Sequence, residues 1–227
     1  MILVKTIESV IQLDNVSMKF KKHIIFEDLY FQCQAKEIIG IVGENGSGKS
    51  VLFKLISGFI IPDKGNISVN GINITRNNAL PDKLGVLIEE PPFLEDITGF
   101  ENLKLLSSIK NEISDADIFE VLKEVGLIDR KDEKVKHYSL GMKKKLGIAQ
   151  AIMEKQEVIL LDEPMNALDE ESVEKMRSLF KKIATKGATI LIASHNKEDI
   201  NKLCDKVYRI KDNKLENIEF DKVHIIV

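Results

Sequence analysis

The 227-residue sequence contains no long hydrophobic run, and this absence bounds where the chain can work. No apolar segment approaches the roughly 18 to 20 residues that a helix needs to cross a bilayer. The apolar run at residues 1–4 is too short for a signal peptide, and the acidic residues Glu8 and Asp14 soon follow it. We therefore expect a cytoplasmic polypeptide, which must rely on another subunit if it acts at a membrane.

Cysteine is also scarce, and neither sign of charge is in large excess. The only cysteines, Cys33 and Cys204, have no C-x-x-C or metal-ligand spacing, so we expect two free thiols in a reducing compartment. A net charge of -3 gives no reason to expect a nucleic-acid partner. The lysine cluster at residues 143–145 is accordingly interpreted as a solvated helix face. With 44% hydrophobic residues, the chain can bury the core of one domain or of two small lobes.

A glycine-rich stretch at residues 43–50 fits the pattern G-x-x-x-x-G-K-S/T. An apolar segment that predicts a buried strand precedes it, and an apolar segment that predicts a helix follows it. In this setting, backbone N–H groups and the helix N-terminus can face phosphate oxygens. The alternative interpretation is a glycine-rich turn that contains Gly-Lys-Ser by coincidence. Lys49 supplies a charge for the β- and γ-phosphates, and the Ser50 hydroxyl is placed to ligate Mg²⁺. The predicted loop residues are Gly43, Glu44, Asn45, Gly46, Ser47, Gly48, Lys49 and Ser50.

Strands and helices alternate along most of the chain, which predicts an α/β fold with a mostly parallel, doubly wound sheet. Alternating apolar and polar residues at about 7–31 predict an antiparallel hairpin, and a second β segment at 65–71 ends in the tight-turn pair Asn70-Gly71. Further core strands are expected at residues 84–88, 158–161, 189–192 and 206–210. Helices are expected at residues 140–153 and around residues 173–183.

The segment from Pro91 to His137 has a different character, because its pattern is helical. Thr98, with a glutamate three residues later, predicts a capping box that opens a helix through about residue 108. Ser114 begins a second predicted helix, which stops at Gly126. We interpret residues 1–227 as one domain, in which a helical subdomain (91–137) is inserted into an α/β core with an antiparallel β subdomain (1–90 and 138–227).

Two carboxylates, Asp162 and Glu163, directly follow the apolar residues 158–161. An aspartate at such a strand end can hold Mg²⁺, and a second carboxylate can act as the general base for an attacking water. A charge cluster at a helix N-terminus is the alternative for this pair taken alone. His195 follows another predicted strand, so it falls at the same carboxyl edge of the sheet, where ligands of such sheets bind.

With residues 138–143 added, the chain resembles, along nearly its whole length, the ATP-binding subunits of ATP-binding cassette (ABC) transporters. The resemblance rests on five ordered motifs, which are Walker A (43–50), the signature (139–143), Walker B (160–163), the D-loop (166–169) and the switch histidine (194–195). It implies a P-loop (RecA-like) core and a head-to-tail homodimer or heterodimer. In this dimer each ATP lies between the Walker A loop of one subunit and Ser139 and Gly141 of the other.

The resemblance also implies roles for single residues. His195 is expected to hydrogen-bond the γ-phosphate and to hold Glu163 and its water in place. Phe20 matches the aromatic residue that stacks on adenine, although a core aromatic explains it equally well. Val51 stands where a second hydroxyl is usual, and Glu89 stands where the family has the glutamine of the Q-loop. We hypothesise that Glu89 lies near the metal and couples the nucleotide state to the helical subdomain.

Residues 89–93, 98–103 and 138–142 look like those of the bacitracin- and lantibiotic-export branch, which works with separately encoded multi-span permeases. The implied function is a Mg²⁺-dependent ATPase that acts at the cytoplasmic face of a membrane and exports peptide antibiotics or similar amphipathic compounds. Two alternatives stay open: a soluble ABC ATPase without a transport role, and an interaction subunit that binds ATP with little turnover. The cargo does not follow from the sequence, because its recognition belongs to the permease.

Overall fold

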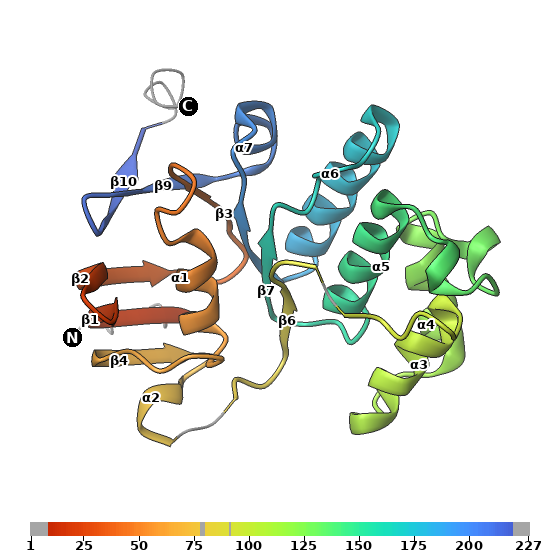
Figure 1. The fold of residues 1–227 in the computed structure, drawn as a ribbon, viewed down its shortest axis with the longest axis horizontal. Helices are drawn as coiled ribbons and strands as arrows, with labels where there is room; N and C mark the ends of the chain where they lie inside the picture. Colours follow the sequence, from red (N-terminus) through yellow and green to blue (C-terminus); the bar gives the residue numbers. More distant parts are fainter. Residues whose placement is uncertain (1–8, 78–79, 91, 220–227) are drawn as a thin grey trace, which may run out of the picture.

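The computed structural model describes residues 9–77, 80–90 and 92–219 (Figure 1). The N-terminal segment that was expected not to be a signal peptide, the start of the predicted hairpin at residues 7–8, and Pro91 lie outside the described residues. Among the described residues, no helix is both long enough and apolar enough to span a membrane.

A six-stranded sheet with the order β10-β9-β3-β8-β7-β6 forms the centre of the molecule. All of its strands are parallel except β10, which pairs with β9 in antiparallel register. The strands β3, β7 and β8 are buried along their whole length, as expected for apolar segments covered on both faces. The predicted mostly parallel sheet is therefore confirmed. Its strands are β3 (Ile38–Val42), β6 (Leu84–Leu87), β7 (Val158–Asp162), β8 (Thr189–Ala193), β9 (Lys206–Lys211) and β10 (Lys214–Ile218).

A second, antiparallel sheet has the order β2-β1-β4-β5. Helix α1 (Lys49–Ile56) joins this sheet and one face of the central sheet in a single apolar core. Alternate residues of β7 show the two-sided packing, since Leu160 belongs to this core and Ile159 to the core on the opposite face. The predicted hairpin and the Asn70-Gly71 turn are both present, and both turn residues have positive φ. The strands are β1 (Ile11–Phe20), β2 (His23–Cys33), β4 (Lys64–Val69) and β5 (Ile72–Asn73).

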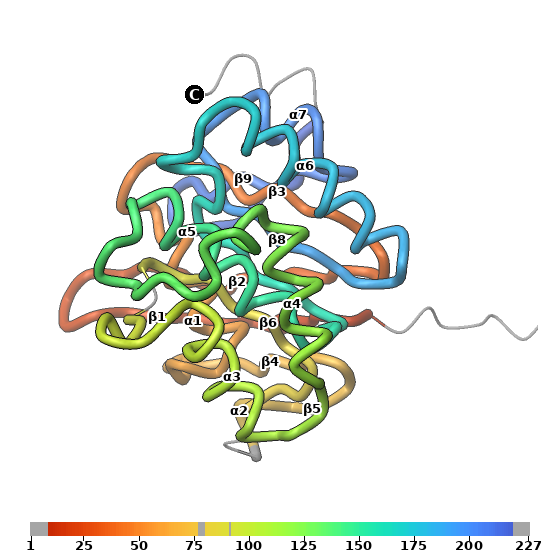
Figure 2. Tube along the Cα trace, turned by 90° about the vertical axis from the view of Figure 1, so that its right-hand side faces the viewer, coloured from red at the N-terminus to blue at the C-terminus, as the bar shows by residue number. Residues whose placement is uncertain are grey.

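The chain between β6 and β7 is helical and lies on the side of the molecule far from the antiparallel sheet (Figure 1). This helical side faces the viewer in Figure 2. Thr98 and Ser114 each form a capping box, as the sequence predicts for Thr98, and Gly126 follows the second helix with φ of 77°. The elements here are α3 (Gly99–Lys110), α4 (Asp115–Glu124), two short 3-10 helices (Ile128–Arg130 and Val135–His137) and α5 (Leu140–Ile152).

Several short elements were not predicted from the sequence, among them the two 3-10 helices and β10, the antiparallel edge strand of the central sheet. The remaining helices are α2 (Ile74–Asn77), α6 (Glu170–Thr185) and α7 (Lys197–Leu203). Of these, α2 and α7 were not predicted, and neither was β5, because elements of two to seven residues carry too little periodicity. The two cysteines are free, as expected, and the structure shows that both are buried. Burial raises the pKa of Cys33 to about 12 and that of Cys204 further still.

Candidate functional site

The glycine-rich loop connects β3 to α1 at the carboxyl edge of the central sheet. Gly48 is the N-cap of α1 and has φ of 108°, and a Cβ atom there would lie 2.9 Å from Ile25 and 3.0 Å from Phe26. Only glycine therefore fits this position without displacing β2. No side chain caps the first turn of α1, and the buried Ser47 hydroxyl has no hydrogen-bond partner among the described residues. The loop thus offers the unpaired donors that a phosphate group requires.

Lys49 is buried, and its ammonium group lies over the loop. Its Nζ atom donates to the carbonyl oxygens of Gly43, at 2.8 Å, and Glu44, at 3.1 Å. Both acceptors are weak partners for a cation compared with phosphate oxygens. The lysine is therefore already placed at the loop, where it can change from carbonyl acceptors to an anionic ligand.

Ser50 and Asp162 are 112 positions apart in sequence, but the fold brings them into contact. The Ser50 hydroxyl donates to Oδ2 of Asp162 at 2.5 Å, and Asp162, the last residue of β7, is only 7% exposed. Among the described residues, no group of three or more His, Cys, Asp or Glu side chains could hold a metal ion. A hydroxyl, one carboxylate and the phosphates of a substrate are nevertheless a sufficient ligand set for Mg²⁺, which keeps several waters. The residues present fit such an ion.

Glu163 and His195 form the second contact at this edge of the sheet. Oε1 of Glu163 lies 2.9 Å from Nδ1 of His195. Glu163 has φ of 48°, which is uncommon for a residue other than glycine, and its N–H donates to the Ala193 carbonyl. This backbone turn aims the carboxylate out of the end of β7 and toward the histidine. A carboxylate held by an imidazole beside a phosphate loop is suited to accept a proton from water.

A cleft of about 440 Å³ joins the loop to the carboxylates. Glu89, which was expected near a metal, lines this cleft, but its carboxylate pairs with Lys54 of α1 at 2.5 Å. The residues Ile25, Glu90 and Lys144 also line the cleft and were not identified from the sequence. The cleft is lined by Ile25, Asn45, Gly46, Gly48, Lys49, Ser50, Val51, Glu89, Glu90, Lys144, Asp162 and Glu163.

Six predicted nucleotide-binding residues do not line this cleft: Gly43, Glu44 and Ser47 of the loop itself, and Phe20, Ser139 and Gly141 outside the loop. Phe20, at the end of β1, is 48% exposed and is not among the lining residues. Ser139 is the exposed N-cap of α5, where its hydroxyl accepts the Met142 N–H at 3.2 Å. Gly141 lies in the first turn of the same helix, and a Cβ atom there would lie 2.7 Å from the Ala167 carbonyl oxygen. The chain thus does not bring Ser139 and Gly141 to its own phosphate loop.

The expectation that the lysines at 143–145 are all solvated is wrong for Lys144. Lys143 is part-exposed and pairs with Glu95, but Lys144 is only 8% exposed. The three residues lie 100° apart around α5, so one of them must turn toward the body of the protein. Because the three residues are identical, the sequence does not show which of them turns inward.

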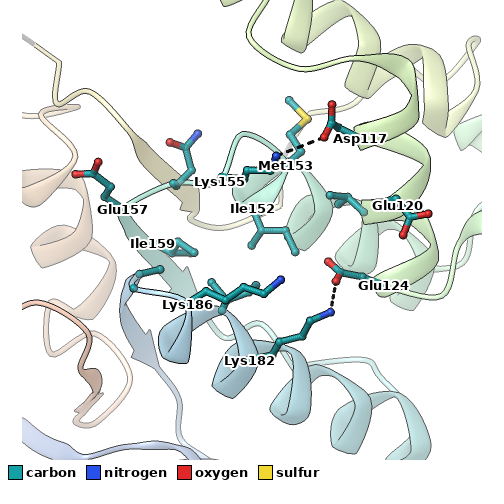
Figure 3. A pocket seen from close by; sticks show the side chains of 15 residues that line it. Asp117, Glu120, Glu124, Ile152, Met153, Lys155, Glu157, Ile159, Lys182 and Lys186 are labelled. Carbon is teal, nitrogen blue, oxygen red and sulfur yellow. Dashed lines mark hydrogen bonds and ion pairs between the residues drawn. The ribbon is translucent and has the colours of Figure 1, made fainter.

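A cavity of about 730 Å³ lies at the opposite end of β7 (Figure 3). Apolar side chains such as Ile159 form its floor, and two ion pairs cross between α4 and the body of the protein. These pairs are Lys182–Glu124, at 2.6 Å, and Lys155–Asp117, at 3.5 Å. The cavity has no phosphate loop, so its size does not make it the nucleotide site.

Comparison with known proteins agrees with this geometry. The family described as ABC transporter matches residues 26–166. The uncharacterized ABC transporter ATP-binding protein YybJ of Bacillus subtilis is 40% identical over 92% of this chain and 96% of its own. The bacitracin transport ATP-binding protein BcrA of Enterococcus faecalis is 32% identical over 96% of this chain and 71% of its own. A solved ATP-binding subunit of an ABC transporter has a TM-score of 0.84 at 24% identity, covering 96% of this chain and 93% of its own, which confirms the predicted fold.

Proposed function

The chain belongs to the ABC transporter family as an ATP-binding ATPase subunit, and we propose that it drives a separately encoded permease that exports an amphipathic antibiotic. The observation that carries the proposal is the pair of contacts at one sheet edge, Ser50 to Asp162 and Glu163 to His195. In this proposal Ser50 and Asp162 are the metal site and Glu163 is the general base, and both contacts support it because they lie at the end of a phosphate loop. A general base is needed for ATP hydrolysis but not for ATP binding, so the contact of Glu163 with His195 favours an ATPase over a subunit that only binds ATP.

In the proposed site, Lys49 and the loop N–H groups bind the β- and γ-phosphates, and Ser50 and Asp162 hold Mg²⁺. When bound, Mg²⁺ neutralises negative charge on the phosphates. Glu163 accepts a proton from water while the water oxygen bonds to the γ-phosphorus and the bond to the bridging oxygen breaks. The ring of His195 orients the Glu163 carboxylate through the 2.9 Å contact, which leaves its other nitrogen for the γ-phosphate.

A second subunit is part of the proposal because Ser139 and Gly141 do not reach the cleft of their own chain. Ser139 is exposed at the N-terminus of α5, so its hydroxyl and the backbone N–H groups there are open to a γ-phosphate bound by another subunit. A homodimer and a heterodimer with a related subunit both satisfy this requirement.

The proposed permease surface lies between the loop after α1 and helix α3. Here a cavity of about 410 Å³ is bordered by apolar side chains that are unusually exposed: Phe59 at 59%, Leu80 at 68% and Ile109 at 78%. Clustered exposed apolar residues favour a protein partner. We assign this surface to an apolar cytoplasmic segment of the permease, which would hold the ATPase at the cytoplasmic face of the membrane.

A pull-down from detergent-solubilised membranes tests this assignment. The tagged wild-type chain is expected to recover a protein with several apolar spans, and Ile109→Asp is expected to lose it. Tyr30→Asp is the matched control, since Tyr30 is 62% exposed on β2, away from the cavity. Recovery of wild type only from the cytosol, with soluble partners, would overturn the permease and favour an ATPase without a transport role.

The cargo class is proposed from the similarity to a bacitracin transport protein. Deletion of the gene is expected to lower the concentration of bacitracin that stops growth, and the wild-type gene should restore it. A Glu163→Gln copy should not. Unchanged sensitivity to bacitracin and to related peptide antibiotics would contradict the cargo class while leaving the ATPase proposal in place.

A further inference from the structure

A buried ion pair links α6 to α7 outside the nucleotide cleft. Nε and a terminal nitrogen of Arg177 donate to Oδ1 of Asp199, at 2.9 and 2.5 Å. The two side chains are 6% and 2% exposed, and no other ion pair of the described residues has both partners buried. Burying two charges costs free energy that their attraction often fails to recover, so stability alone is a weak reason for such a pair.

The buried pair continues into the turn that carries His195. The Ser194 hydroxyl donates to the second oxygen of Asp199, at 3.5 Å, and accepts the N–H of Asn196, at 3.0 Å. The Asn196 side chain in turn accepts N–H groups of the first turn of α7. Ser194 and Asn196, the two neighbours of His195, are therefore both held by hydrogen bonds to Asp199 or to the first turn of α7. The ring of His195 is itself 57% exposed, so packing does little to fix it.

The pair also links the two segments that form the Glu163–His195 contact. Glu163 lies in the loop that leads from β7 into α6, and His195 lies in the turn that leads from β8 into α7. Arg177 and Asp199 join these two helices. A shift of α7 against α6 would therefore move the His195 nitrogen away from the Glu163 carboxylate.

We propose that Arg177 is a positioning residue for ATP hydrolysis, which acts through Asp199 and the Ser194 turn to hold His195 against Glu163. This inference rests on the proposed function of His195. Arg177 suits the task because its rigid, planar guanidinium holds one oxygen of Asp199 with two nitrogens, which leaves the other oxygen for Ser194. A third nitrogen binds Glu174 and Glu198 at the protein surface.

A double-mutant cycle with Arg177→Met and His195→Ala tests the proposal. In the wild-type background, Arg177→Met is expected to lower kcat for ATP about ten- to a hundredfold, because small misplacements of a catalytic group have effects of this size. KM should stay unchanged, since the phosphate loop is not touched. In the His195→Ala background, the same substitution should have no further effect on kcat, because its target is absent.

Two more variants separate positioning from a general loss of structure. Lys202→Met removes the exposed ion pairs of the same network, with Glu174 and Glu198, and should leave kcat within about twofold of wild type. Arg177→Lys retains the charge and should restore part of kcat. If Arg177→Met does not fold, Asp199→Asn replaces it in the cycle, because it keeps the side-chain volume.

The outcomes distinguish this inference from the function on which it rests. A normal kcat in Arg177→Met with a lowered melting temperature, or an equal loss of kcat in both backgrounds, would overturn the positioning role. A normal kcat in His195→Ala would instead overturn the proposed function of His195.

Discussion

Replacing Asp162 by asparagine should hardly change the free energy of unfolding without ligand, but it should strongly reduce the extra stabilisation that Mg²⁺ and nucleotide give. The amide oxygen can still accept the Ser50 hydroxyl that Asp162 accepts at 2.5 Å, and the side chain keeps its volume in a site that is 7% exposed. The loss is then the difference between a charged and a neutral hydrogen bond, about 1 kcal/mol. The variant should therefore fold and unfold almost as the wild type does.

The response to Mg²⁺ and nucleotide should differ much more. A ligand at 100 times its Kd stabilises the folded state by about 2.7 kcal/mol. If loss of the carboxylate weakens binding about a hundredfold, the same concentration equals the new Kd, and the stabilisation falls to about 0.4 kcal/mol. The predicted signature is a loss of roughly 2.3 kcal/mol that exists only in the presence of ligand.

Urea unfolding followed by circular dichroism measures both quantities, with Mg²⁺ and a non-hydrolysable ATP analogue or with the analogue and EDTA. Glu157→Gln is the matched control, since it removes an exposed carboxylate just before the other end of β7. It should be stabilised by the ligand as wild type is. Equal stabilisation of Asp162→Asn and wild type by Mg²⁺ and the analogue would refute the assignment of Asp162 to the metal site.

Three further predictions concern other parts of the chain. Glu89→Gln should lower turnover and shift its Mg²⁺ dependence. Unchanged turnover and Mg²⁺ dependence would remove the metal role of Glu89. The same effect in Lys54→Met would also remove it, because the effect would then come from the loss of the Glu89–Lys54 ion pair. Burial raises the pKa of Cys33 from 9.0 to about 12, because the folded protein favours the neutral thiol. The contribution of this thiol to stability is therefore complete below pH 9 and is lost as the pH rises toward 12. In that window the urea-derived free energy of unfolding should fall about 1.4 kcal/mol per pH unit for this thiol, and Cys33→Ala should lessen the slope. Gly85→Ala should destabilise the protein by about 3 kcal/mol or more, because its Cβ would lie 1.8 Å from the Ala151 carbonyl oxygen; a wild-type melting temperature would contradict this packing.

The elements that the sequence predicts well are those whose signals are local. The loop at residues 43–50, the capping box at Thr98 and the turn at Asn70 each depend on a few neighbouring residues, and the structure has them where they were expected. The buried strand β7 was recognisable because its apolar run leaves no polar face. Helix α7 was missed because seven residues form about two turns, too few for an apolar stripe to stand out.

Contacts between distant segments could not be predicted in the same way. The sequence placed Ser50 and Asp162 at one sheet edge, but only the structure shows that they share a hydrogen bond. The pairing of Glu89 with Lys54 and that of Arg177 with Asp199 leave no sequence pattern, because an ion pair needs only two suitable side chains at the right place. The family resemblance supplied the role of His195, and its contact with Glu163 is a property of the fold.

The most direct test of the central claim is a comparison of wild type with Glu163→Gln, by ATP turnover and by size-exclusion chromatography with light scattering. The substitution keeps the side-chain volume and the contact with His195 but removes the proton acceptor. We predict that Glu163→Gln loses turnover about a hundredfold or more, in line with the loss of a general base, and accumulates as an ATP-bound dimer. Wild type should return to the monomer as ATP is consumed. Hydrolysis by Glu163→Gln at the wild-type rate would contradict the claim.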